Sequence, residues 1–103
     1  MFTIKDIQYC CVQNKIKWSS HAATRIHQRG LTREDIIHCL IHGEIIEEYP
    51  DYWLGPACLI FGHTINNHII HVVVGLDEYL HIITAYYPNN TKFKPDMKTR
   101  KER

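Results

Sequence analysis

Hydrophobic residues in the first 42 positions recur at the spacing of an α-helix, about 3.6 residues per turn. Three helices are predicted, over residues 3–14, 18–29 and 32–42. Their apolar stripes are Ile4, Ile7 and Cys11 in the first, Ala22, Ala23 and Ile26 in the second, and Ile36, Ile37, Leu40 and Ile41 in the third.

Capping residues support two of these helices. Ser19 is a candidate N-cap after Trp18, and Gly30 follows the last residue of the same helix as a C-terminal stop. Thr32 and Asp35 have the spacing of a capping box with a carboxylate in the third position.

After Gly43 the pattern changes to short apolar runs separated by turn residues. Strands are predicted over residues 44–49, 58–65, 68–76 and 79–87, with Asn66-Asn67 and Asp77-Glu78 as tight turns. Helices followed by consecutive strands predict an α+β fold, in which two to three N-terminal helices pack on a four-stranded antiparallel β-meander.

The chain has 103 residues, of which 45% are hydrophobic and 22% charged, as expected of one soluble domain. We expect the domain to cover residues 1–90, followed by a basic tail over 91–103. No apolar run approaches membrane-spanning length, and the N-terminus lacks the features of a signal peptide, so a cytoplasmic location is expected. In a reducing compartment Cys10, Cys11, Cys39 and Cys58 are expected to be free and mostly buried thiols.

A net charge of +1 excludes a protein that coats nucleic acid through an overall basic surface. Contact with nucleic acid would therefore need a local patch. The tail is one candidate, with half of the 12 Lys and Arg residues of the chain, at Lys92, Lys94, Lys98, Arg100, Lys101 and Arg103. It is either a binding arm or a frayed, solvated terminus.

The helix over 18–29 is the other candidate patch. His21, Arg25, Gln28 and Arg29 share one arc of it, whereas His27 falls outside that arc. A titratable imidazole beside fixed positive charge suits metal-free phosphodiester cleavage. The same residues could also hold an RNA phosphate without cleaving it, or form an ordinary solvated surface.

Polar residues also interrupt the apolar strands. His71 lies in the third strand, and in the fourth strand strict alternation places Thr84 and Tyr86 on one face with His81 on the other. Sequence does not fix the register between these strands, and Thr and Tyr are also ordinary strand residues.

Eight histidines raise the question of a metal site. His38 and His42 are four residues apart, but no third ligand follows at a recognisable interval, so a solvated helix face is favoured. A group formed by Cys58, His63, His68 and His71 matches no usual zinc spacing. No metal or other cofactor is expected.

Five blocks resemble domain-of-unknown-function family 4258. They are W-S-S-H-A-A-T-R-I-H-Q-R-G-L-T-R-E-D-I-I at 18–37, G-E-I-I-E-E-Y-P at 43–50, L-I-F-G at 59–62, H-V-V-V-G at 71–75 and I-I-T-A-Y-Y-P at 82–88. The family resembles the small RNase toxins that share an α+β fold with barnase, EndoU and RelE. Such toxins are often encoded beside an antitoxin protein.

The resemblance implies a metal-independent endoribonuclease toxin that acts on RNA and is held by a cognate antitoxin. His21 and His71 would be the acid/base pair, Arg25 would hold the phosphate and Tyr86 would support catalysis. Arg29, Thr84 and Gln28 would bind substrate. The alternatives are a non-catalytic RNA- or protein-binding module of the same fold, and a metal-dependent hydrolase. The sequence leaves the oligomeric state open.

Overall fold

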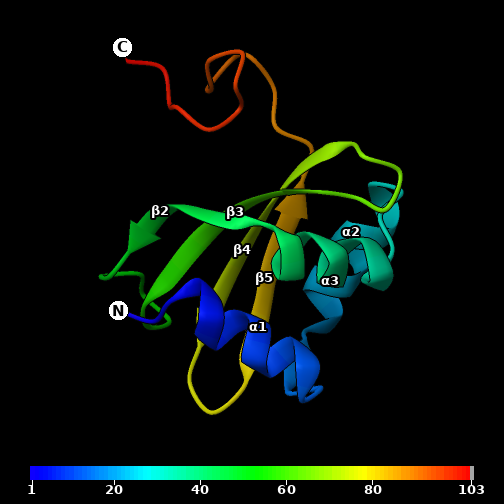
Figure 1. Cartoon of the computed structure of the whole chain (residues 1–103), viewed down its shortest axis with the longest axis vertical. Coiled ribbons are helices and arrows are strands. Elements are labelled where there is room, and N and C mark those ends of the chain that lie inside the picture. Colours follow the sequence, from blue (N-terminus) through cyan, green and yellow to red (C-terminus); the bar gives the residue numbers. More distant parts are fainter. Residues whose placement is uncertain (103) are drawn as a thin grey trace.

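The computed structural model of the chain describes residues 1–102, and it has three helices and a five-stranded sheet (Figure 1). The α+β class predicted from the sequence is confirmed. The elements in chain order are α1 (Ile4–Val12), β1 (Ile16–Trp18), α2 (Ser20–Gln28), α3 (Arg33–His42), β2 (Glu44–Tyr49), β3 (Ala57–His63), β4 (Ile69–Leu76) and β5 (Leu80–Tyr86).

The sheet order is β1-β5-β4-β3-β2, and β2 to β5 form the predicted antiparallel meander. The fifth strand, β1, was not predicted. It pairs in parallel with β5, with Ile16 opposite Leu80 and Trp18 opposite Ile82. Trp18 therefore ends a strand, and α2 begins at Ser20 with Ser19 as its N-cap.

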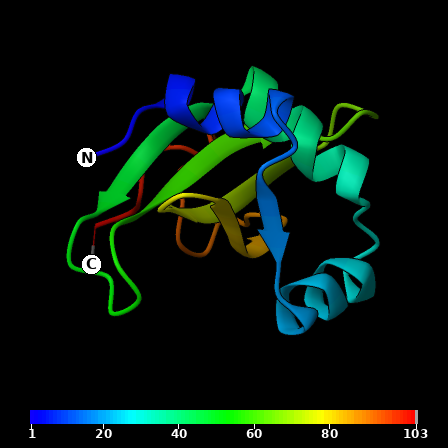
Figure 2. The same ribbon diagram turned by 90° about the horizontal axis from the view of Figure 1, so that it is seen from below.

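Helices α1 and α3 lie along one face of the sheet (Figure 2). The core between them is apolar, and its fully buried members include Ile7, Ile36, Leu40, Ile60 and Val72. On α3 the buried stripe is Ile36, Cys39 and Leu40, whereas Ile41, which the sequence pattern placed inside, is exposed. A side chain at Gly62 would come within 2.5 Å of the Cys39 sulfur, so that glycine lets α3 approach β3 closely.

All four cysteines are free, and Cys10, Cys39 and Cys58 are buried, as the sequence predicted. Burial raises the pKa of both the Cys39 and Cys58 thiols to about 12. Within residues 1–102 no helix is long and apolar enough to cross a membrane.

The C-terminal segment, residues 91–102, packs against the sheet and is not a frayed terminus. The side chain of Phe93 is 2% exposed, and its backbone forms an isolated β-bridge with Arg100. Arg100 in turn makes two hydrogen bonds to the carboxylate of Glu47 on β2, at 2.9 and 3.0 Å. Arg103, the last residue of the predicted tail, lies outside the described residues.

Candidate functional site

An open groove of about 540 Å³ lies between α2, β5 and the loop from residue 50 to 56. It brings together residues from three separate segments of the chain. Its lining consists of Lys17, Ser19, His21, Arg25, Tyr52, Trp53, Leu54, His81, Ile82, Ile83 and Thr84.

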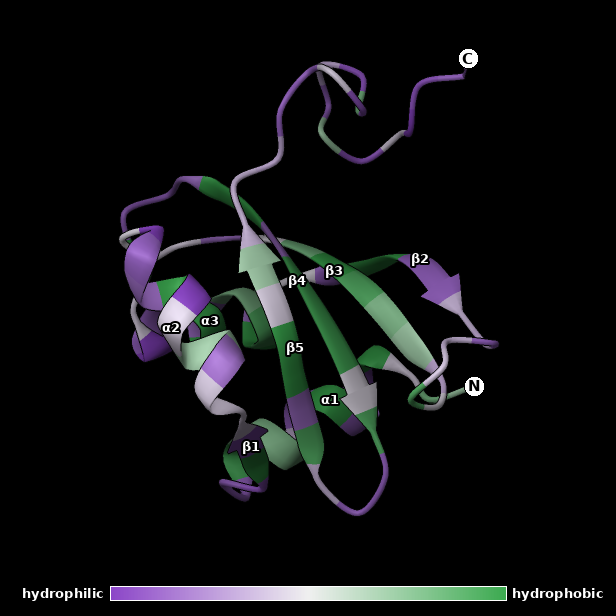
Figure 3. Cartoon of the chain, turned by 180° about the vertical axis from the view of Figure 1, so that it is seen from behind, coloured by the Kyte–Doolittle hydropathy of each residue, from purple (hydrophilic) through white to green (hydrophobic). Residues whose placement is uncertain are grey.

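The cap and the apolar face of α2 fix the direction of its polar side chains. The Ser19 hydroxyl accepts a hydrogen bond from the Ala22 N–H at 3.0 Å and starts the helix. Ala22 and Ile26 are buried. His21 and Arg25 lie one turn apart on the exposed side and line the groove. Figure 3 shows α2 beside β5, with a ribbon that alternates between hydrophilic and apolar residues.

Arg29 has a different environment from Arg25. Its Nη1 donates hydrogen bonds to the Thr84 hydroxyl at 3.2 Å and to the Ala85 carbonyl at 2.7 Å. These bonds tie the end of α2 to β5. Arg29 therefore positions the helix, and Gln28 beside it is exposed. Both were predicted to bind substrate, but neither is among the described residues that line the groove.

His81 is the groove residue that sequence reasoning missed. The predicted strict alternation in β5 was wrong, because the register shifts between Val73 and Val74, which pair with Thr84 and Ile82. The extra residue in β5 is a β-bulge, and it brings His81 and Thr84 to the same groove. The signal in the sequence that could have singled out this histidine is Asp77, an acidic residue in the predicted turn four positions before it.

Asp77 holds the ring of His81. Its Oδ1 lies 2.9 Å from His81 Nε2 and also accepts a hydrogen bond from the Tyr79 N–H at 2.8 Å. The backbone bond from Tyr79, followed by the bond to His81, lowers the pKa of the Asp77 carboxyl. The carboxylate therefore orients the imidazole and can balance a positive charge on it.

The groove also carries cationic and aromatic side chains. The ammonium of Lys17 lies 4.4 Å above the ring of Tyr79, and Arg25 is exposed. The side chain of Trp53 is 81% exposed, with the ring of Tyr52 at a centroid distance of 6.3 Å. Positive charge beside exposed aromatic rings is the combination that binds single-stranded nucleic acid.

His71 and Tyr86, predicted from the sequence as catalytic, contact each other elsewhere. The Tyr86 hydroxyl donates to His71 Nδ1 at 3.3 Å, and His71 Nε2–H donates to the Met97 carbonyl at 2.6 Å. The ring of Phe93 lies edge-on at 4.7 Å, and His71 is fully buried. Of the described residues, those that line the groove include His21 but neither His71 nor Tyr86, so the structure does not bring the predicted pair together.

Burial lowers the pKa of His71, although the bond to Met97 and the charge of Glu47 act in the opposite direction. Both ring nitrogens are engaged, and the pattern fits the neutral tautomer with its proton on Nε2. Nearby, the Tyr49 hydroxyl also bonds to Glu47, and Arg100 lowers the pKa of the Glu47 carboxyl. This network joins β2, β4, β5 and the C-terminal segment.

Over residues 1–102, no group of three His, Cys, Asp or Glu side chains is arranged to hold a metal ion. The rings of His38 and His42 are 4.7 Å apart. His38 Nδ1 lies 3.0 Å from the His63 carbonyl, a contact that links α3 to the end of β3.

Residues 18–87 match the family described as "Domain of unknown function (DUF4258)". No curated protein and no solved structure matches the chain. The matched region begins at Trp18, the last residue of β1, and ends one residue beyond β5, so it contains α2, the loop of residues 50–56 and β5. Because the match covers more than half of its residues, the chain belongs to the DUF4258 family.

Proposed function

We propose that the protein is a metal-independent endoribonuclease of the toxin–antitoxin type, acting in the cytoplasm, with His21 and His81 as its acid/base pair. The observation that carries this proposal is the meeting of two accessible imidazoles and the Arg25 guanidinium at one groove. His81 takes the role that sequence reasoning gave to His71.

The chemistry requires three tasks that these residues can perform. One imidazole takes the proton of the ribose 2′-hydroxyl, whose oxygen then attacks the phosphorus. The other, in its protonated form, gives a proton to the departing 5′-oxygen, leaving a 2′,3′-cyclic phosphate. Arg25 offers two parallel donors to the phosphate oxygens, where negative charge increases in the transition state.

Three residues that take no part in the proton transfer support this arrangement. Asp77 holds the His81 ring at 2.9 Å, which fixes its orientation during proton transfer. Arg29 holds the C-terminal end of α2 against β5, so that His21 and Arg25 keep their place opposite His81. Lys17 adds positive charge at the same groove.

The test is cleavage of single-stranded RNA by the purified protein in the presence of EDTA. His21→Ala, His81→Ala and Arg25→Ala should each lower the rate by about 100-fold or more, because each removes a proton-transfer group or a transition-state charge. His27→Ala is the matched control, since His27 is also exposed on α2 but faces a different side of the helix.

Cleavage at the wild-type rate in both histidine variants, or cleavage that EDTA abolishes, would contradict the proposal.

The exposed Trp53 and the cations favour a second candidate function, a non-catalytic module that binds RNA or a cognate antitoxin through the same groove. RNA binding by the wild type without any product would support that candidate.

A further inference from the structure

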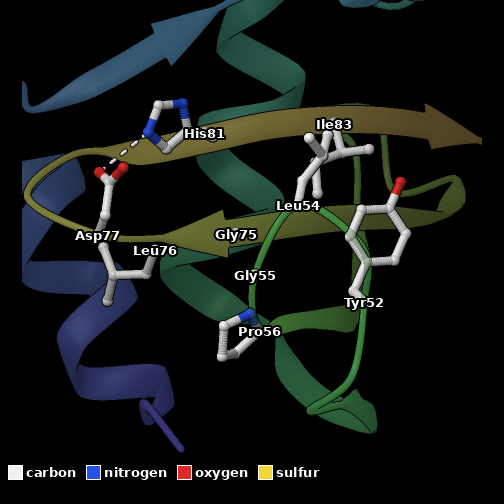
Figure 4. Close-up of a pocket in the computed structure, with 9 residues that line it drawn as sticks. All are labelled: Tyr52, Leu54, Gly55, Pro56, Gly75, Leu76, Asp77, His81 and Ile83. Atoms are coloured by element: carbon white, nitrogen blue, oxygen red, sulfur yellow. Dashed lines mark hydrogen bonds and ion pairs between the residues drawn. The ribbon is translucent and has the colours of Figure 1, made fainter.

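A second cavity, of about 330 Å³, adjoins the groove, and Figure 4 shows the residues that line it. The two hollows share Tyr52, Leu54, His81 and Ile83 as a common wall. In Figure 4, Tyr52, Leu54 and Pro56 come from the loop, and His81 and Ile83 come from β5. A ligand of moderate length could therefore occupy both hollows at once.

The chemistry of the two hollows differs. The groove carries His21, Arg25 and Lys17, whereas the cavity is lined mainly by carbon, from Leu54, Pro56, Leu76, Ile83 and the ring of Tyr52. Asp77 is the acidic residue in the cavity lining, and the structure describes no hydrogen bond to its Oδ2. A molecule that fits both hollows has a phosphate beside a flat, largely apolar ring with N–H groups at its edge.

Gly75 supplies an independent observation. It lies within β4, where glycine weakens a strand, and it does not have the positive φ that would require glycine. A Cβ at this position would meet only ordinary contacts, 3.5 Å from the Pro56 carbonyl oxygen and 3.7 Å from Ile83 Cδ1. The local backbone therefore has room for a Cβ atom, and a larger side chain at this position would extend into the cavity that the glycine lines.

We infer that the cavity lined by Gly75, Tyr52 and Asp77 is a nucleobase subsite, which holds the base next to the phosphate bound at His21 and Arg25. This inference rests on the proposed ribonuclease function and extends it to recognition of the nucleotide. The base lies against Tyr52 and the aliphatic wall, and Asp77 Oδ2 accepts a hydrogen bond from its N–H edge.

The test compares binding of nucleoside 3′-monophosphates with binding of ribose 5-phosphate, which has no base. In the wild type the base should tighten binding by about 5- to 150-fold, the range expected for stacking of one base on an aromatic side chain. Trp53, on the rim of the groove, provides a fluorescence signal. Equal affinity for the two kinds of phosphate would overturn the inference.

Two variants locate the subsite. Gly75→Leu fills the cavity, so it should abolish the extra affinity that the base gives to nucleoside 3′-monophosphates and leave the affinity for ribose 5-phosphate unchanged. Gly75→Ala is the matched control and should keep this extra affinity. If Gly75→Leu fails to fold, Leu54→Ser, at a side chain that is 65% exposed, removes part of the apolar wall and should reduce the same extra affinity. If the folded variant, Gly75→Leu or Leu54→Ser, kept the full extra affinity for nucleoside 3′-monophosphates, the inference would be overturned.

Cleavage assays on the same proteins separate this inference from the proposed function. Binding that depends on the base, without any RNA cleavage, would support the subsite and refute the ribonuclease. Cleavage by a wild type that gains nothing from the base would support the ribonuclease and refute the subsite.

Discussion

His71 and His81 lie on neighbouring strands and have opposite environments. His71 is fully buried with both ring nitrogens bonded, whereas the His81 side chain is 41% exposed and has one nitrogen held by Asp77. A buried ring with two satisfied nitrogens contributes to the fold. An accessible ring held by a carboxylate is ready to exchange a proton with a ligand.

Because His71 is buried, we expect the free energy of unfolding to depend on pH. Because burial places the folded-state pKa of His71 below its unfolded value of about 6.5, the unfolded chain binds the proton first as the pH falls. The contribution of neutral His71 to the free energy of unfolding is therefore complete above about pH 6.5. Below that pH the free energy of unfolding declines, by at most about 1.4 kcal/mol per pH unit. Chemical denaturation between pH 5 and 7.5 measures this decline.

His71→Gln keeps a side-chain N–H donor but does not titrate. Its free energy of unfolding should be lower than that of the wild type at pH 7.5, and it should vary less over the same range. Glu47, whose pKa is lowered, loses its contribution only as the pH falls below its usual range near 4.5, outside this window. Parallel curves for the wild type and the variant would contradict the assignment of this pH dependence to His71.

At the scale of the elements, α2 depends on β5 for its position. The helix has only nine residues, and its buried residues, Ala22 and Ile26, make a small apolar face. Short helices gain most of their stability from tertiary contacts. The two hydrogen bonds of Arg29 to β5 are therefore a main reason why His21 and Arg25 face the groove.

Arg29→Ala should lower the free energy of unfolding by about 2 kcal/mol, because hydrogen bonds from a charged donor are lost at a partly buried site. RNA cleavage should fall as well, since α2 loses its anchor. Gln28→Ala, at the exposed neighbouring position, should change neither quantity by much. Denaturant titrations and cleavage rates on the three proteins check this, and full stability of Arg29→Ala would argue against the anchoring role.

At the scale of the whole molecule, the sheet has two differently used faces. One face is covered by α1 and α3 and forms the core. On the other, the C-terminal segment covers the region of His71 and Phe61, while the groove and the adjoining cavity lie between α2, β5 and the loop of residues 50–56. This division decides which histidines can reach a ligand.

Phe93 anchors the C-terminal segment, and Phe93→Ala should destabilise the protein by about 3 kcal/mol, the usual cost of removing a buried phenyl ring. Lys94→Ala, at the exposed next position, should have little effect. Urea denaturation of both variants provides the comparison. A change below about 0.5 kcal/mol for Phe93→Ala would mean that the segment contributes no stability in solution.

The sequence by itself determined the elements that depend on local interactions. The capping residues Ser19 and Thr32, the turn at Asn67 and the apolar runs of β2 to β5 depend on residues a few positions apart, so they can be read directly from the chain. His21 and Arg25 were placed on one side of a helix for the same reason.

Only the tertiary structure decided which distant groups meet. The parallel pairing of β1 with β5 and the docking of Phe93 and Met97 on His71 join segments far apart in sequence. The bulge in β5, which brings His81 and Thr84 to the same groove, depends on how β5 pairs with β4. Periodicity carries no information about such contacts, because their free energy comes from packing and burial that exist only once the chain has folded. For that reason His71 was predicted to be catalytic and is found buried, and His81 was overlooked although it lines the groove.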